Sequence, residues 1–298
     1  SLANLYIRLS KWYEAEKCLK KAIKREPHSA SAYNTMGNFF LQQDDEKKEK
    51  KAKDAYYNAL KINPHHPDAL YNLANILLKQ NDIDEATNYL NTCVDVYPEH
   101  APALGLLAKI AAQNGNDQKA IKFAQQSLSH SQKDPEIFHT LATCYIRNNQ
   151  SQQAIELLLQ VIEHAPDIID AKYHLATAYM NAGQHDEALK YYFQYAQSEK
   201  DIDSYYNIGV IMMYKEHHKD AIRYFRQVID MDNTYIQAHQ NLGSLYLRTG
   251  KIKQAKQHYQ IILDMEPKNQ EVKHILAAIS QKSTPNRAPQ QYVEHLFD

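Results

Sequence analysis

The chain of 298 residues is long enough for one large domain or two, and its formal net charge of −1 excludes a global attraction to nucleic acid or to an anionic membrane. Three cysteines, Cys18, Cys93 and Cys144, lie far apart, so the sequence implies no disulfide framework. Each is predicted to behave as a small buried apolar residue in a reducing compartment, which indicates a cytoplasmic location. No apolar run approaches the roughly 18 residues of a membrane span, so we expect neither membrane insertion nor a nucleic-acid partner.

Small residues recur along the chain at a nearly constant interval. One site, held by alanine or glycine, repeats at intervals of 34, 37, 34, 34, 34, 33 and 34 residues. A second site, always alanine, follows with a similar spacing, and in five copies a proline stands twelve residues after it. A period near 34 over almost the whole chain is typical of a repeat architecture. The first small site is Ala3, Gly37, Ala74, Ala108, Ala142, Ala176, Gly209 and Gly243, and the second is Ala15, Ala52, Ala86, Ala120, Ala154, Ala188, Ala221 and Ala255.

Each period predicts two amphipathic helices joined by a tight turn. In the copy from 239 to 267, Leu242 and Tyr246 fall on one face of a first helix, and Tyr259 and Ile262 fall on one face of a second. A proline ends the second helix, because proline cannot continue a hydrogen-bonded turn. The small sites let the two helix backbones come close together. The turn between the helices needs a positive φ, which we predict at Gly115, Gly183 and Gly250, with asparagine instead at Asn81 and Asn149.

This pattern resembles the tetratricopeptide repeat, with its motif W-x2-L-G-x2-Y, then A-x3-F, then P. The segment Asn241–Tyr246 reads NLGSLY, and Ala255, Tyr259 and Pro267 follow at the required positions. The resemblance implies an all-α fold, a right-handed α-solenoid of stacked antiparallel helix pairs that forms a superhelix. It also implies that residues 1–281 are one array: a partial repeat, seven full repeats from about 30, 67, 101, 135, 169, 202 and 236, and a closing helix over 270–281.

Two units depart from this pattern. Ala111, Ala124 and Ser127 stand where larger apolar groups are usual, so the unit over 101–134 is predicted to pack thinly. The unit that holds Gly37 is three residues longer than most, and we interpret its lysine-rich segment, 44–53, as a solvated insertion.

The resemblance further implies a concave surface, lined by the first helix of each pair, that binds an extended peptide or a partner protein. Primary amides suit a peptide backbone because each offers a donor and an acceptor to the main chain. Helical phase gives the candidate peptide-binding residues as Asn38, Tyr71, Asn72, Asn75, His139, Tyr173, His174, Tyr206, Asn207, Gln240, Asn241, Ser244 and Arg248, with Arg147 beside them.

Two other interpretations of the asparagines stay open. They are similar to the asparagine ladder in the repeat arm of the O-linked N-acetylglucosamine transferase, although residues such as Leu106 and Thr140 interrupt it. Alternatively, the amides hydrogen-bond within the array and have no role in binding. A carboxylate clamp like that of chaperone-binding tetratricopeptide domains is disfavoured, because Pro102 and Leu106 stand where its basic side chains belong.

Residues 1–281 contain no motif for catalysis, and we expect no catalytic residue, metal site or cofactor there. The fifteen histidines are scattered, without a cysteine or carboxylate set at ligand spacing. The pairs His65–His66 and His217–His218 fall in or near predicted turns, and we interpret them as solvated.

The last residues, 282–298, form a polar linker followed by the segment APQQYVEHLFD. This segment resembles the junction in bacterial proteins that join a tetratricopeptide array to an S-adenosylmethionine-dependent methyltransferase, where Ala-Pro-x-x-Tyr-Val-x-x-Leu-Phe-Asp opens the enzyme. The resemblance implies that the array recruits substrates or partners for a methyltransferase domain that is truncated here, with S-adenosylmethionine as the cofactor of that domain alone. The alternatives are a segment that folds back to cap the array, a free-standing adaptor, and the arm of a glycosyltransferase.

The thin packing predicted for residues 101–134 generates a test of stability. Repeat arrays are held together by the interfaces between neighbours, so the least apolar interface should open first. Among the internal repeats, we expect amide hydrogen exchange to be fastest between about residues 101 and 134. Native-state exchange followed by mass spectrometry measures this directly, and uniform protection along the array would contradict it.

Overall fold

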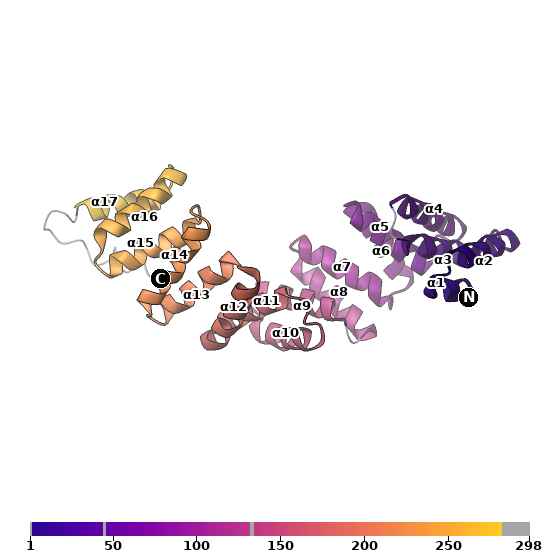
Figure 1. The fold of residues 1–298 in the computed structure, drawn as a ribbon, viewed down its shortest axis with the longest axis horizontal. Coiled ribbons are helices and arrows are strands. Elements are labelled where there is room, and N and C mark those ends of the chain that lie inside the picture. The colour runs from indigo at the N-terminus through magenta and orange to yellow at the C-terminus, as the bar shows by residue number, and fades with distance from the viewer. Residues whose placement is uncertain (1, 44–45, 132–133, 282–298) are drawn as a thin grey trace. The chain divides into compact units, whose positions relative to one another are not determined.

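The computed structural model describes residues 2–43, 46–131 and 134–281, which form seventeen helices and no strand. The helices follow one another as antiparallel pairs, as Figure 1 shows along each part of the chain. The chain divides into two compact units, the first unit over Ser1–Pro166 and the second unit over Asp167–Asp298. The predicted all-α fold of stacked antiparallel helix pairs is confirmed.

The first unit contains ten helices within the residues described. In chain order they are α1 (Leu2–Arg8), α2 (Trp12–Arg25), α3 (Ala30–Leu41), α4 (Glu46–Ile62), α5 (Pro67–Lys79), α6 (Ile83–Val96), α7 (Ala101–Gln113), α8 (Asp117–His130), α9 (Pro135–Arg147) and α10 (Ser151–His164).

The second unit contains the remaining seven helices described. They are α11 (Asp170–Asn181), α12 (His185–Glu199), α13 (Ile202–Tyr214), α14 (His218–Met231), α15 (Ile236–Arg248), α16 (Ile252–Met265) and α17 (Gln270–Gln281).

The turn between the two helices of a pair is built on one residue with positive φ, as predicted. The three glycines have φ near 72°, and Asn81 and Asn149 take their place at 61° and 58°. Ser10 and Glu216 occupy the same position with φ of 54° and 59°, which the search for glycine and asparagine missed. Because the turn fixes φ rather than residue type, a repeat with serine or glutamate there still folds back tightly.

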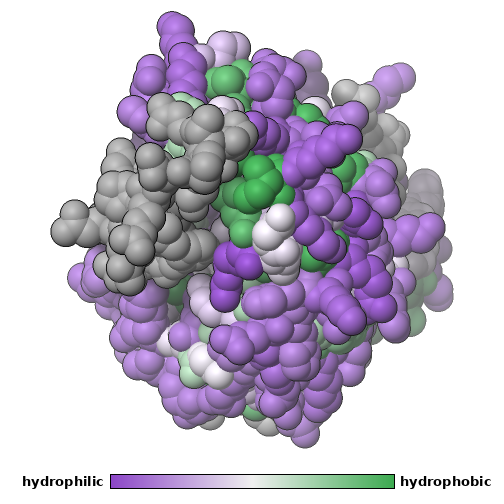
Figure 2. All heavy atoms as spheres, turned by 90° about the vertical axis from the view of Figure 1, so that its left-hand side faces the viewer, coloured by the Kyte–Doolittle hydropathy of each residue, from purple (hydrophilic) through white to green (hydrophobic). Residues whose placement is uncertain are grey.

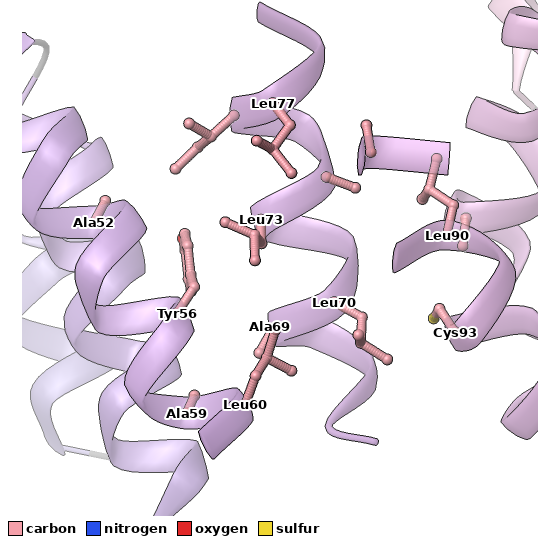
Figure 3. Packing of buried hydrophobic residues seen from close by; sticks show 14 of the residues in the cluster. Ala52, Tyr56, Ala59, Leu60, Ala69, Leu70, Leu73, Leu77, Leu90 and Cys93 are labelled. Carbon is pink, nitrogen blue, oxygen red and sulfur yellow. The ribbon is translucent and has the colours of Figure 1, made fainter. Parts of the chain in front are cut away.

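Side chains from three consecutive helices form the main core of the first unit. Leu73 and Leu77 of α5 are fully buried, and Figure 3 shows them between Tyr56 of α4 and Leu90 of α6. Cys93 of α6 belongs to the same cluster, and burial raises the pKa of its thiol to about 11. The prediction of buried apolar cysteines is confirmed for Cys93 and Cys144, while Cys18 is only half-buried.

Glycine at the first small site occurs where the facing side chain of the second helix is an aromatic ring. A Cβ on Gly243 would lie 2.8 Å from Cζ of Tyr259, and a Cβ on Gly209 would lie 2.7 Å from Cε1 of Phe225. Gly37 faces Tyr56 in the same way. Where the small site is alanine, the facing residue is usually smaller, and the pairs are Ala3 with Leu19, Ala74 with Leu90, Ala108 with Ala124 and Ala142 with Leu158; Ala176 with Tyr192 is the exception.

Of the three small residues in the unit over 101–134, only Ala111 leaves space beside it that no side chain of the described residues fills. Ser127 is 3% exposed, and its hydroxyl donates a 2.8 Å hydrogen bond to the carbonyl of Ala101. Ala124 is fully buried, and Gly105 admits Ile137 of α9, whose Cδ1 lies 2.9 Å from where a Cβ would be. A cavity remains beside Ala111.

The lysine-rich insertion lengthens a helix. It places extra residues at the start of α4, which runs for 17 residues. The ammonium groups of Lys48 and Lys51 lie 5.6 and 5.8 Å from the ring centroid of Phe40, where they interact with its π face. The described part of this segment is therefore helical and contacts the preceding helix, while Lys47, Lys50 and Lys51 stay exposed to solvent, as the interpretation of a solvated insertion expects.

The helix α17 closes the second unit. Val272, Ile275 and Ile279 pack against the core that α14, α15 and α16 form, while Glu271 and Lys273 are exposed. Figure 2 shows this end of the chain as largely hydrophilic, with a small hydrophobic patch. A polar outer face is what a terminal repeat needs to end the stack.

The pairing of glycine with a facing ring predicts a change of sign in stability. Gly243→Ala should destabilise the protein on the order of 1 kcal/mol, because overpacking costs about 1–3 kcal/mol and alanine returns about 1 kcal/mol of helix propensity. In the Tyr259→Leu background, which reproduces the Ala142 and Leu158 pair, the same substitution should stabilise. Urea unfolding of the four proteins measures both effects, and a loss of equal size in the two backgrounds would show that the facing ring is not the cause.

Candidate partner-binding surface

In the first unit, the predicted amides are connected to one another across three helices. The Nδ2 of Asn72 on α5 donates to Oδ1 of Asn34, at 3.1 Å, and to Oδ1 of Asn38, at 3.0 Å, both on α3. The hydroxyl of Tyr56 on α4 donates to the same oxygen of Asn38, at 2.6 Å. The two bonds from Asn72 connect one repeat to the next, and they occupy both hydrogens of its amide group.

Two further candidates on α5 lie beside this network. The Nδ2 of Asn75 donates to the carbonyl of Tyr71 on its own helix, at 3.0 Å. The ring of Tyr71 lies 5.6 Å from that of His100, centroid to centroid.

Arg147, on α9, forms an ion pair with Asp117 of α8. Its Nε lies 2.9 Å from a carboxylate oxygen, and the contact lowers the pKa of that carboxyl. Arg147 is therefore committed to an internal ion pair.

In the second unit, the asparagine side chains contact tyrosine hydroxyls instead of other amides. The Nδ2 of Asn241 on α15 donates to the hydroxyl oxygen of Tyr206 on α13, at 3.1 Å. One repeat earlier, the side chain of Asn207 interacts with the hydroxyl of Tyr173 and lowers its pKa against the larger, raising effect of burial. Each asparagine thus contacts a phenol of the preceding repeat, and the arrangement occurs twice in succession.

Carboxylates border these tyrosines. The hydroxyl of Tyr195 donates to Asp170 at 2.7 Å, and the hydroxyl of Tyr235 donates to Asp203 at 2.7 Å. Burial raises the pKa of both tyrosines, and the hydrogen bond to the carboxylate raises it further. The negative charges of Asp203 and Asp201 also raise the pKa of Tyr173.

The tyrosine rings are packed together. Tyr173 lies 5.5 Å from Tyr195 and 5.6 Å from His174, centroid to centroid. Tyr206 lies 5.2 Å from Tyr235. We call this group the tyrosine–aspartate row, and its members are Asp170, Tyr173, Tyr195, Asp201, Asp203, Tyr206, Asn207, Tyr235 and Asn241.

The other candidates are not members of this row. Gln240 and Arg248 are exposed on α15, and Ser244 is half-buried on the same helix. His139 lies on α9 of the first unit and His174 on α11 of the second. Sequence reasoning missed Asp170 and Asp203, although a signal was present: each stands three residues before a tyrosine of the row, Tyr173 or Tyr206, and they recur 33 residues apart.

Two histidines cap helices. The Nδ1 of His66 accepts from the backbone N–H of Ala69, at 3.3 Å, and its Nε2 lies 3.1 Å from the hydroxyl of Ser31. His100 begins α7 in the same way, with Nδ1 3.2 Å from the N–H of Ala103. Since His66 is only 9% exposed, its interpretation as a solvated histidine is wrong. An N-cap satisfies an N–H that the helix itself leaves unpaired.

A histidine pair, with His239 buried and His258 half-buried, joins α15 and α16 in the second unit. The Nδ1 atoms of His239 and His258 are 2.9 Å apart, and Nε2 of His239 lies 3.0 Å from the carbonyl of Asn233. Because that carbonyl accepts only, His239 carries its proton on Nε2 and accepts at Nδ1 from His258. Burial, and then the charges of His239 and Arg226, lower the pKa of His258 to about 4.

The described residues contain no group of three or more histidine, cysteine or carboxylate side chains placed to hold a metal ion. Among the helices described, none combines the length and the apolar character that crossing a membrane requires. The segment 288–298, which carries the resemblance to the methyltransferase junction, lies outside the described residues.

Comparison with known families finds tetratricopeptide repeats along most of the chain. One model described as a tetratricopeptide repeat matches residues 45–110, 77–143 and 213–279, and a second matches 1–67. A model described as subunit 3 of the anaphase-promoting complex, or cyclosome, matches 113–195. The matched models do not include a methyltransferase, so they give the junction resemblance no support.

Several solved structures share the fold at low sequence identity. YrrB, described as a TPR protein with an unusual peptide-binding site, is 21% identical with a TM-score of 0.58, over 62% of this chain and 96% of its own. PilF of Pseudomonas aeruginosa is 12% identical with a TM-score of 0.57, over 71% and 97%. The Cut9–Hcn1 hetero-tetramer of the APC/C is 16% identical with a TM-score of 0.53, over 83% and 47%. No curated protein matches the chain significantly.

The histidine pair predicts an acid-sensitive second unit. The pKa of His258 is about 4 in the folded protein and about 6.5 when unfolded, so below pH 6.5 the unfolded chain binds the additional proton. The stability that neutral His258 contributes is complete above about pH 6.5 and is lost as the pH falls toward 4.

The measurement is thermal unfolding of the wild type and of His258→Phe between pH 4 and 7. The phenyl ring keeps an aromatic neighbour for Tyr246, which stacks on His258 at 5.6 Å, and it removes the titrating group. We expect the Tm of the wild type to fall more steeply than that of the variant. His274→Gln, at an exposed site on α17, is the control; equal slopes for the wild type and His258→Phe would contradict the prediction.

Proposed function

This chain belongs to the tetratricopeptide repeat family, and we propose that its second unit binds an extended peptide segment that carries a basic side chain. The family and the fold make the protein a scaffold for protein–protein interaction. The finer proposal depends on the tyrosine–aspartate row, where an aspartate and a tyrosine recur on α11 and α13 and an asparagine recurs on α13 and α15.

The carrying observation is the hydrogen bond from Asn241 to Tyr206. Because Asn241 donates to the phenolic oxygen, the hydroxyl hydrogen of Tyr206 remains available to donate to a peptide carbonyl. The structure gives Oδ1 of Asn241 no partner within the described residues, so this oxygen can accept a peptide N–H. Together the two side chains present one donor and one acceptor, which are the two groups that an extended backbone offers.

The charge of the row selects the side chain of the peptide. Asp203 is exposed and Asp201 is half-buried, and both lie close enough to raise the pKa of Tyr173 by their negative charge. The faces of the tyrosine rings also attract cations. A lysine or arginine side chain gains from both effects, whereas an acidic side chain would be repelled.

The first unit offers less to a peptide backbone at the equivalent positions. Both hydrogens of Asn72 are donated to Asn34 and Asn38, and Oδ1 of Asn38 also accepts from Tyr56. Of the two interpretations left open for the asparagines, the internal one therefore suits Asn72 and the binding one suits Asn241. The peptide-binding site named for YrrB belongs to that protein, and at 21% identity its likeness to this chain is one of fold.

We also carry forward the hypothesis that the array recruits partners for a methyltransferase. This hypothesis rests on the tail segment alone. We also propose that the protein is cytoplasmic. A strand and a glycine-rich turn encoded after Asp298 would support this hypothesis, and a stop codon would favour the adaptor.

The proposed function predicts that Asn241→Ala weakens peptide binding without unfolding the array. The probes are two fluorescein-labelled pools of octapeptides, randomised except for a central lysine in one and a central glutamate in the other. We expect the lysine pool to bind more tightly at low salt, and Asn241→Ala to weaken both pools about tenfold, which corresponds to about 1.4 kcal/mol for the lost backbone contacts.

Two further variants separate charge from structure. Asp203→Asn keeps an acceptor for Tyr235 and removes one of the charges, so it should reduce the preference for lysine and leave binding of the glutamate pool unweakened. Asn72→Ala should lower the midpoint of unfolding while peptide affinity stays the same. Equal affinity for both pools in the wild type, or unchanged binding in Asn241→Ala, would refute the proposal.

A further inference from the structure

A cavity of about 450 Å³ opens in the first unit between α6, α7 and α8. Its apolar lining includes Leu107, Ile110 and Ala111 of α7 and Phe123 of α8. Polar side chains of α6 and of the turn after α7 surround it. Its volume lies within the usual range of ligand pockets, which is roughly 300–1,000 Å³.

Other repeats of the same chain fill the equivalent space with an aromatic ring. Ala111 stands three residues after the first small site, and Tyr246 holds that position in α15. The ring of Tyr246 stacks on His258 at 5.6 Å, and Arg226 lies 6.0 Å from its centroid.

The residues that surround Tyr246 have counterparts in the cavity. By their places in the repeat, His258 corresponds to Phe123, because each stands three residues after the second small site. Arg226 corresponds to Asn91, because each stands five residues after that site in the preceding repeat. Both Phe123 and Asn91 line the cavity.

Two more repeats show the same contacts. Tyr179, the counterpart of Ala111 in α11, stacks on Tyr191 at 5.8 Å with an interplanar angle of 13°. In α9 the counterpart is Tyr145, whose hydroxyl accepts a 3.1 Å hydrogen bond from Nε2 of Gln125. Gln125 occupies the position of Asn91, so an amide at this position contacts a tyrosine hydroxyl one repeat away.

We propose that this cavity binds a tyrosine side chain of a partner protein, with the ring beside Phe123 and the hydroxyl at the amide of Asn91. The two walls that hold a ring elsewhere are present, and the ring itself is replaced by the methyl group of Ala111. The inference does not depend on the peptide site of the second unit.

The rim fits a peptide rather than an isolated phenol. Asn88, one turn before Asn91, and Asn114, in the turn after α7, both line the cavity with exposed side chains. The structure gives their side-chain amides no hydrogen-bond partner within the described residues. Each offers a donor and an acceptor to the main chain on either side of an inserted tyrosine.

The first experiment follows p-cresol, which is the tyrosine side chain alone, by ¹H–¹⁵N TROSY spectra of the whole chain. We expect shifts confined to residues around Asn91, Ala111 and Phe123, with affinity at least several-fold higher than for toluene. In Asn91→Leu that preference should disappear. N-acetyl-tyrosine amide should shift the same signals, and binding of p-cresol without binding of this amide would overturn the assignment to a partner protein.

The second experiment fills the cavity from inside. Ala111→Tyr restores the residue found in α9, α11 and α15, and it should abolish p-cresol binding while leaving Tm unchanged or higher. Should that variant fail to fold, Ala111→Leu, which reproduces Leu77 of the preceding repeat, makes the same test. Asn241→Ala, in the second unit, should bind p-cresol like the wild type. Undiminished binding to the filled variant, or shifts spread over the surface, would overturn the proposal.

Discussion

The close approach of the two helices in each pair is the constraint on which the rest of the structure depends. At Gly243 the backbone of α15 comes so near to the ring of Tyr259 that a single methyl group would not fit. Where the small site is Ala74, the facing side chain is Leu90, and the same closeness is reached with fewer atoms on the second helix. This fit fixes the rotation of each first helix about its axis, and so decides which of its side chains face neighbouring repeats.

The same constraint explains where a repeat tolerates small residues. Ala124 leaves no hole, because Gly105 on the facing helix lets Ile137 move in from the next repeat. Ala111 has no such replacement: it packs with Ala120 and Cys144, and a cavity stays open beside it between α6, α7 and α8. A cavity that lies between well-packed contacts keeps its shape, and a fixed shape is what distinguishes a binding site from a loose core.

Much of the fold could be predicted because it depends on period and residue size. The spacing of small residues gave the helix pairs, and positive φ was expected correctly at Asn81 and Asn149. Hydrogen-bond partners could not be predicted, since helical phase indicates the face on which Asn72 lies but not that two amides of α3 are within its reach. The cap formed by His66 was missed for the same reason, because it depends on an N–H that only the three-dimensional helix end exposes.

The difference between a structural amide and one suited to recognition lies in its neighbour. When Asn72 donates to the oxygens of Asn34 and Asn38, the donation ends there, because an amide oxygen has no hydrogen to pass on. When Asn241 donates to Tyr206, the phenol still has a hydrogen to donate. Because its oxygen accepts the bond from Asn241, the O–H group is more strongly polarised and becomes a better donor. A residue pattern that places asparagine on two first helices therefore predicts binding only where the preceding repeat supplies a hydroxyl. That condition is met on α13 and α15, and the aspartates beside the same tyrosines add the charge that selects a basic side chain.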